Sequence, residues 1–173
     1  MNRLLIPFSL VAVAILLVAL QCTVTWRWSP WGVRLELLPP LLVYMAFTVN
    51  LPTAFFLGAF SALLYDSLSA GAMGASVIPY LVNVTLFSAL RPIFFRSRLS
   101  TRFFNGVIAG FFTLLLQWLF SGKAVAVPFG AVLPKILRLA TLCGLLSVAY
   151  FLVLDAAFRA SGLNPGRFEE DAP

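Results

Sequence analysis

One acidic side chain, Asp66, is the residue most able to do chemistry within the apolar part of the chain. It is the only acidic or basic residue in the range 37–90. A carboxylate on a membrane-spanning helix costs about 2.5–3.5 kcal/mol at the bilayer centre. Asp66 therefore requires a partner, a path to water or a position near the membrane surface.

The other residue types give little support to catalysis. The chain has no histidine, and its two cysteines, Cys22 and Cys143, both fall in apolar runs. No Gly-x-Ser-x-Gly elbow, phosphate-binding loop or cluster of carboxylates is present to supply a nucleophile, a base or a metal site. Asp155 lies four residues before Arg159, a spacing typical of an ordinary helix-end ion pair. We predict that the protein is not an enzyme and holds no metal or other cofactor.

Composition places the chain in a membrane. It has 173 residues, of which 61% are hydrophobic and 10% are charged, and its mean hydropathy is +0.99. A soluble domain with so few polar residues could not cover its own surface. The net charge is +6, but the basic residues are predicted at helix ends, where membrane topology accounts for them. We therefore expect an all-α integral membrane protein, one domain over 1–173, without a nucleic-acid partner.

Six membrane spans follow from the apolar runs, the charges and the helix-breaking residues. They are expected at 4–25, 37–50, 52–70, 75–91, 103–121 and 131–156. The first is interpreted as a retained helix, because Gln21 precedes Cys22 where a lipoprotein signal has a small residue. The second is the weakest, since Pro39 and Pro40 belong in a first helical turn and Pro52 follows soon after. Spans two and three are predicted to form a tight hairpin with one short, tilted or partly irregular arm, which protein or water must shield.

The distribution of lysine and arginine sets the expected orientation. With a cytoplasmic N-terminus, the inner segments carry Arg3, Arg91, Arg96, Arg98, Arg102, Arg159 and Arg167. The outer segments carry fewer basic residues: Arg27, Arg34, Lys123, Lys135 and Arg138. Both termini are therefore predicted to be cytoplasmic, with a short tail over 159–173. The outer interface is expected to be anchored by three aromatic residues, Trp26, Trp28 and Trp31.

Asp66 belongs to a row of small residues on the predicted third span. The row comprises Ala54, Gly58, Ala62, Asp66 and Ala70, at intervals of four. Small residues on one helix face let another helix approach closely, so Asp66 is expected to face protein, and we interpret the row as a face for a partner helix. Lys135 and Arg138, on the same side of the membrane, are its candidate ion-pair partners. The alternatives are that Asp66 caps the next turn or is solvated at the interface, or that it titrates during transport.

Small residues recur at the same spacing on spans five and six. The pairs are Gly106 with Gly110, and Ala140 with Gly144. We expect these two helices to cross closely within the protein. A face for a homodimer is the alternative.

The connection between spans four and five holds the densest group of basic residues. This basic loop contains Arg91, Arg96, Arg98 and Arg102, interleaved with apolar residues. Anionic lipid head groups attract such a segment by about 1 kcal/mol per basic residue. We expect the loop to lie against the cytoplasmic lipid surface. Docking of an acidic cytoplasmic partner is the alternative.

Three segments in the range 36–90 form a recognisable pattern: Leu38-Pro-Pro-Leu-Leu-Val-Tyr44, Phe56-Leu-Gly58 and Leu64-Tyr-Asp-Ser-Leu-Ser-Ala-Gly-Ala-Met-Gly74. This pattern resembles the core of a bacterial family, the rod-shape-determining MreD proteins. It implies that Gly58, Asp66, Gly71 and Gly74 occupy recurring positions of the family. Glycine at the last two suits a turn, because it adopts positive φ freely. The chain departs from the family at Pro40, where a polar or acidic residue is common.

The resemblance implies a function that composition does not. Such proteins are non-catalytic scaffolds that help to direct lateral peptidoglycan synthesis in the bacterial cytoplasmic membrane. Their implied partners are MreC first, then the MreB filament, RodA and a class B penicillin-binding protein. The implied fold is a compact bundle of about six helices, similar to the substrate-binding subunits of energy-coupling-factor transporters.

Such a transporter subunit is itself the alternative function. A subunit that binds a vitamin should line its outer cavity with hydrogen-bonding and aromatic groups. Here the supply is limited to the three tryptophans together with Asn83, Gln117 and Asp66. Thermal stabilisation by a small ligand would favour the transporter, whereas rounding of depleted cells would favour the scaffold.

Overall fold

A computed structural model describes residues 2–24, 36–69, 74–92, 99–120 and 128–162. These ranges form six α-helices: α1 (Asn2–Val24), α2 (Leu38–Thr48), α3 (Leu51–Leu68), α4 (Val77–Leu90), α5 (Leu99–Phe120) and α6 (Phe129–Ala160). Each helix overlaps one predicted span. The largest differences are at α5, which begins before the predicted 103, and at α6, which continues past the predicted 156.

The exterior of the helices is apolar. Four of the described helices, α1, α3, α5 and α6, are long and apolar enough to cross a membrane, whereas α2 and α4 are shorter. Large apolar side chains point outward from them, and Phe8 and Phe56 are 71% and 70% exposed. Extensive apolar surface of this kind is suited to lipid and not to water. The predicted class, a helical membrane protein, is therefore confirmed.

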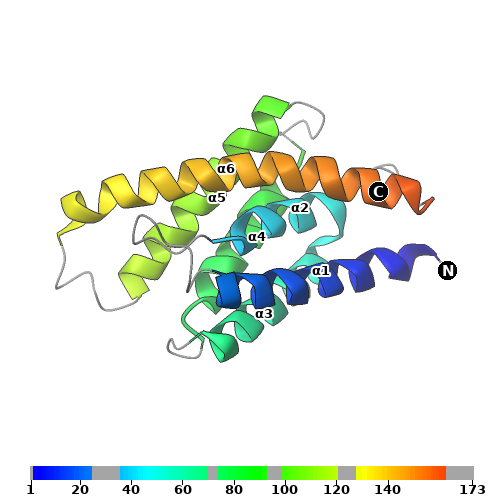
Figure 1. Ribbon diagram of the computed structural model, residues 1–173, viewed down its shortest axis with the longest axis horizontal. Coiled ribbons are helices and arrows are strands. Elements are labelled where there is room, and N and C mark those ends of the chain that lie inside the picture. Colours follow the sequence, from blue (N-terminus) through cyan, green and yellow to red (C-terminus); the bar gives the residue numbers. More distant parts are fainter. Residues whose placement is uncertain (1, 25–35, 70–73, 93–98, 121–127, 163–173) are drawn as a thin grey trace.

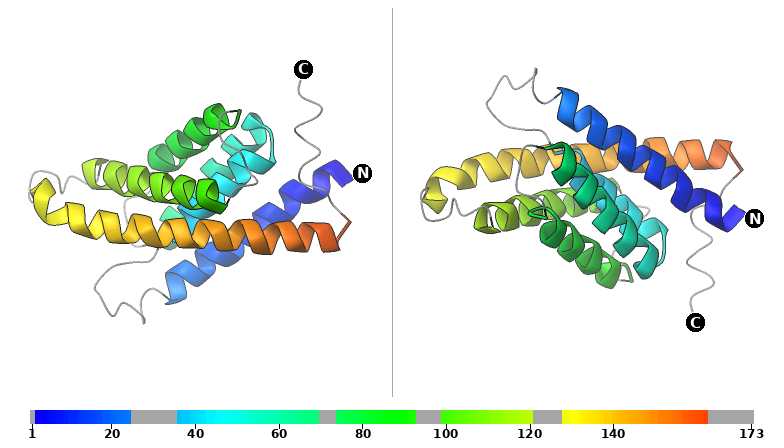
Figure 2. Two further views of the ribbon diagram at one scale, coloured as in Figure 1. Left: turned by 90° about the horizontal axis from the view of Figure 1, so that it is seen from above. Right: turned by 90° about the horizontal axis from the view of Figure 1, so that it is seen from below.

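The helices form a bundle in which the chain returns to its starting side. The first turn of α1 and the last turn of α6 lie at the same end of the molecule, as both views in Figure 2 show. Helix α6 runs along the length of the bundle, and α5 crosses it obliquely (Figure 1). Helix α3 packs against α1 and α4, and α4 packs against α5.

Helix α2 lies at the centre of this bundle. It packs against each of the other five described helices, and every residue from Leu38 to Thr48 is buried. A helix that is apolar on all sides lies either in a protein core or in lipid, and α2 is too short to span a bilayer. Pro39 and Pro40 occupy its first turn, where their missing N–H groups break no helical hydrogen bond. The short second span is thus shielded by protein, as the sequence led us to expect, because it lies at the centre of the bundle.

Helices α5 and α6 cross at van der Waals contact through their glycines. A Cβ atom added to Gly106 would lie 2.7 Å from the backbone oxygen of Cys143 and would overlap the Cβ of Ser147. One added to Gly110 would lie 2.7 Å from the Cβ of Cys143. The predicted close crossing is confirmed, because these glycines are covered by a helix of the same chain.

Candidate functional site

The small-residue row of α3 faces the interior of the bundle. Ala54, Gly58, Ala62 and Asp66 are all buried. A Cβ added to Gly58 would lie 2.9 Å from Cγ2 of Val84, on α4. The row therefore seats α3 against its own neighbours, and its role is internal packing and not presentation to a partner.

Asp66 holds the turn between α3 and α4. Its Oδ2 atom accepts hydrogen bonds from the backbone N–H of Gly74, at 2.9 Å, and of Ser76, at 3.0 Å. Ser76 is the N-cap residue of α4 and makes no side-chain capping bond of its own. Gly74 has φ +92°, a conformation that glycine adopts without strain. The carboxylate thus satisfies two backbone donors at the positive end of the helix dipole. This geometry is the capping alternative from the sequence.

The structure does not bring Asp66 together with Lys135 and Arg138. Both basic side chains are exposed on α6, while α3 packs against α1, α2 and α4. The carboxylate of Asp66 already accepts two backbone N–H groups, so it has less need of a counter-charge. The candidate ion pair is replaced by a cap.

We expect Asp66→Ala to lower the free energy of unfolding by about 2 kcal/mol, because two backbone N–H groups lose a charged acceptor. The loss is measured by denaturing the detergent-solubilised protein with SDS. Lys135→Gln and Arg138→Gln are the matched controls, and each should change the free energy by less than about 0.5 kcal/mol. A loss in either control equal to that of Asp66→Ala would instead favour the ion pair.

The two ends of the basic loop turn inward onto α2. Arg91 directs Nη1 to the backbone oxygen of Val49, at 3.5 Å, where α2 ends. A cation in this position complements the negative end of the helix dipole. The side chain of Arg102 is only 11% exposed and lies beside Asp155. These two arginines are therefore structural, which corrects the expectation that they lie against lipid or a partner. The predicted site residues that lie outside the described ranges are Arg96, Arg98, Gly71, Trp26, Trp28 and Trp31.

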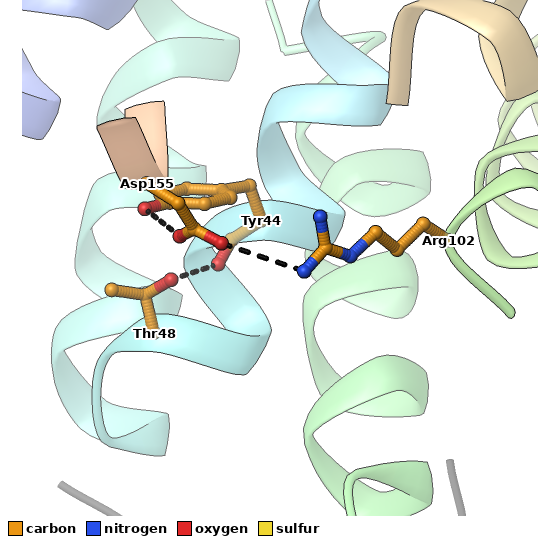
Figure 3. A network of polar contacts seen from close by, with 4 residues as sticks. All are labelled: Tyr44, Thr48, Arg102 and Asp155. Carbon is orange, nitrogen blue, oxygen red and sulfur yellow. Dashed lines mark hydrogen bonds and ion pairs between the residues drawn. The ribbon is translucent and has the colours of Figure 1, made fainter. Parts of the chain in front are cut away.

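A buried polar network joins α2, α5 and α6, as Figure 3 shows. Asp155 Oδ2 lies 3.6 Å from Nη2 of Arg102, and the two side chains are only 10% and 11% exposed. The hydroxyl of Tyr44 donates a hydrogen bond to Asp155 Oδ1, at 3.0 Å. The hydroxyl of Thr48 donates in turn to the backbone oxygen of Tyr44, at 2.7 Å. The network thus anchors the central helix α2 to α5 and α6, the two helices that are farthest from it in the sequence.

Aromatic rings enclose the network. The guanidinium of Arg102 lies 5.0 Å from the ring centroid of Phe151, within the range of a cation–π contact. Phe151 also packs edge-on against Tyr44, at 5.0 Å between centroids, and Phe158 stacks on Tyr44 at 6.4 Å. Low polarity around an ion pair strengthens both its attraction and the penalty for breaking it.

The sequence reading missed this network. It paired Asp155 with Arg159, but Arg159 is exposed and Asp155 is buried. The signal that could have found it is helical spacing, since Asp155 shares a face of α6 with Phe151 and Phe158. Phe151, Asp155 and Phe158 follow at intervals of four and three, so they lie on one face of α6, and all three are buried.

The first residues of α2 are fixed by a second set of polar contacts. The backbone N–H of Leu37 donates to Oε1 of Gln21, at 3.0 Å. The thiol of Cys143 donates to the backbone oxygen of Glu36, at 3.6 Å. These contacts tie the start of α2 to α1 and α6. Both ends of the central helix are therefore held by side chains of its neighbours.

The chemistry available at these sites is binding and positioning. Among the residues that the structure describes, no three His, Cys, Asp or Glu side chains are grouped so that they could hold a metal ion. Asp66 and Asp155 each accept hydrogen bonds that fix their geometry. In comparisons with known proteins, the chain matches no family model, no curated protein and no solved structure.

Proposed function

We propose that this chain is a non-catalytic scaffold of the bacterial cell-elongation machinery, acting in the cytoplasmic membrane with both termini in the cytoplasm. It organises lateral peptidoglycan synthesis by binding MreC, and through that contact it acts with MreB, RodA and a class B penicillin-binding protein. The proposal starts from the resemblance of residues 36–90 to the MreD family.

One observation supports the scaffold most directly: the two acidic residues of the predicted spans, Asp66 and Asp155, hold helices together. Asp66 binds the backbone at the start of α4, and Asp155 binds Tyr44 and Arg102. Groups fixed in this way are poorly suited to carry protons or substrates through a cycle. They are well suited to a rigid body that presents constant outer faces to partner helices.

The residues that carry the resemblance also have a shared structural role. The proline-led segment becomes the central helix α2, and the segment from Leu64 to Gly74 contains the acid and the glycine of the α3–α4 turn. A motif that specifies the framework of the bundle is expected in a family whose function is to present surfaces.

Depletion in the rod-shaped bacterium that encodes the chain tests the proposal. We expect depleted cells to widen and become round, and we expect tagged protein to co-purify with MreC from detergent extracts. Restoration of rod shape by the wild-type chain controls for effects on neighbouring genes. Cells that keep their width and rod shape under complete depletion would contradict the scaffold.

A transporter subunit is the second candidate, favoured by buried polar atoms near the start of α2. Glu36 Oε2, the hydroxyl of Tyr80 and Asn83 Oδ1 have no hydrogen-bond partner among the residues that the structure describes. A vitamin bound there would raise the melting temperature of the purified protein. A scaffold should show no such response to vitamins.

A further inference from the structure

Glu36 is buried next to the start of α2 and is held there by three helices. Glu36 is only 5% exposed. The thiol of Cys143, on α6, bonds its backbone oxygen, and Gln21, on α1, bonds the next backbone N–H. The side chain of Gln117, on α5, lies close to the Glu36 carboxyl group. The second carboxyl oxygen, Oε2, accepts no hydrogen bond from any described residue.

Two polar residues of α4 face the same region. Tyr80 and Asn83 are fully buried and, being three residues apart, share one face of the helix. Asn83 donates from Nδ2 to the hydroxyl of Thr113 and to the backbone oxygen of Ala109, at 3.4 Å. Its Oδ1 atom is left without a partner, and so is the hydroxyl of Tyr80.

The register of α4 on α5 brings these residues toward Glu36. The two helices pack together and run in opposite directions along the chain. Asn83 of α4 contacts Thr113 of α5. Because the two helices are antiparallel, Tyr80, about one turn before Asn83, lies at the level of Gln117, about one turn after Thr113. Gln117 in turn contacts Glu36. Tyr80 accordingly lies within electrostatic range of Glu36.

The three atoms without a hydrogen-bond partner can all act as acceptors. Glu36 Oε2 and Asn83 Oδ1 are acceptors, and the Tyr80 oxygen can also accept. The titratable groups facing this region are Cys143 from α6 and Tyr80 from α4, with Tyr65 and Asp66 of α3 acting on Tyr80. None of these groups carries a positive charge. A buried carboxylate without a cationic partner is costly until a proton or a metal ion neutralises it.

We propose that Glu36, Tyr80 and Asn83 form a buried binding site for a small monovalent cation, either a proton or Na⁺. Glu36 supplies the negative charge, and the oxygens of Tyr80 and Asn83 complete the site. Occupation removes the charge penalty and fixes α4 against the start of α2. The inference is independent of the proposed scaffold function, because it concerns an ion within one chain and not a partner protein.

Thermal unfolding of the purified chain in detergent tests the site. At pH 8.5, NaCl replaces N-methyl-D-glucamine chloride at constant ionic strength, and the melting temperature is followed by tryptophan fluorescence. For Na⁺ we expect a rise of about 4 °C for each tenfold increase above the dissociation constant. If the site binds a proton, we expect the melting temperature without Na⁺ to rise as the pH falls from 8.5 to 5.5. Adding Na⁺ at pH 8.5 should then leave the melting temperature unchanged. The sign follows because a proton bound to the folded state stabilises it and is lost as the pH rises.

Two variants make the test specific. Glu36→Gln keeps the shape of the side chain and should abolish the response to both cations. Tyr80→Phe should shift the response to about tenfold higher cation concentration, whereas the control Tyr150→Phe should leave it unchanged. A wild-type melting temperature that responds to neither cation would overturn the site. A melting temperature that responds to cation as strongly in Glu36→Gln as in the wild type would also overturn the site. If Glu36→Gln does not fold, an undiminished response in Tyr80→Phe decides against the site.

Discussion

Replacing Asp155 with asparagine is expected to lower the free energy of unfolding by about 3–5 kcal/mol, the largest loss that we predict for a single isosteric change. The substitution removes the charge that faces Arg102, at 3.6 Å. The guanidinium of Arg102, which also lies over the ring of Phe151, then loses its ion pair with this carboxylate. The loss is measured by SDS denaturation of the detergent-solubilised protein, with helix content followed by circular dichroism.

The matched control is Arg159→Gln. Arg159 is the partner that the sequence suggested, but its side chain is exposed, so the change in free energy should be less than about 0.5 kcal/mol. Removing the whole network should restore stability, because apolar groups of similar volume avoid the burial of charge. The triple variant Tyr44→Phe, Arg102→Met, Asp155→Leu is therefore expected to lie within about 2 kcal/mol of wild type. Equal losses in Asp155→Asn and Arg159→Gln would show that the buried network is assigned wrongly.

Replacing Gly106 with leucine is expected to separate α5 from α6 and to cost about 3 kcal/mol or more, at the upper end of overpacking effects. Even a single Cβ at this position would lie 2.7 Å from a backbone oxygen of α6, which cannot rotate away. The added isobutyl group must therefore displace the whole helix. The same SDS titration measures the loss, and Gly106→Ala should give a smaller loss in the same direction.

Gly130 provides the control for that prediction. It also lies in a helix, but an added Cβ would meet no atom within 4 Å. Gly130→Ala should leave stability unchanged or raise it by up to about 1 kcal/mol, because alanine favours the helix. A similar loss in Gly106→Ala and Gly130→Ala would contradict the α5–α6 crossing as the cause, because an added Cβ meets no atom within 4 Å at Gly130.

The helices and one of their contacts could be predicted from sequence because the signals are local. Long apolar runs separated by charges and prolines mark the six helices, and the spacing of Gly106 and Gly110 marks a face that another helix can approach. The capping role of Asp66 was available as an alternative, since the acid is followed closely by glycines and the start of the next helix. Each of these features depends on residues that are near one another in the chain.

The two polar sites around α2 could not be predicted, because they depend on which helix occupies the centre. Asp155 has a basic residue four positions away, and only the rotation of α6 shows that it faces Arg102 instead. Glu36 directly precedes the predicted second span, at 37–50. It is buried because α2 begins inside the bundle, at the level of Cys143 in α6. Neither the depth nor the central position of α2 is encoded in its own eleven residues.

The central claim is that the carboxylates of Asp66 and Asp155 are architectural and that the protein acts as a scaffold. The triple variant Tyr44→Phe, Arg102→Met, Asp155→Leu tests it most directly when it replaces the wild-type chain in depleted cells. Protein level in the membrane and melting temperature are measured in parallel with cell width. The account predicts that a stably folded triple variant sustains rod shape as the wild type does, because no step of its function uses the ion pair. Round cells containing normal amounts of the folded variant would contradict it.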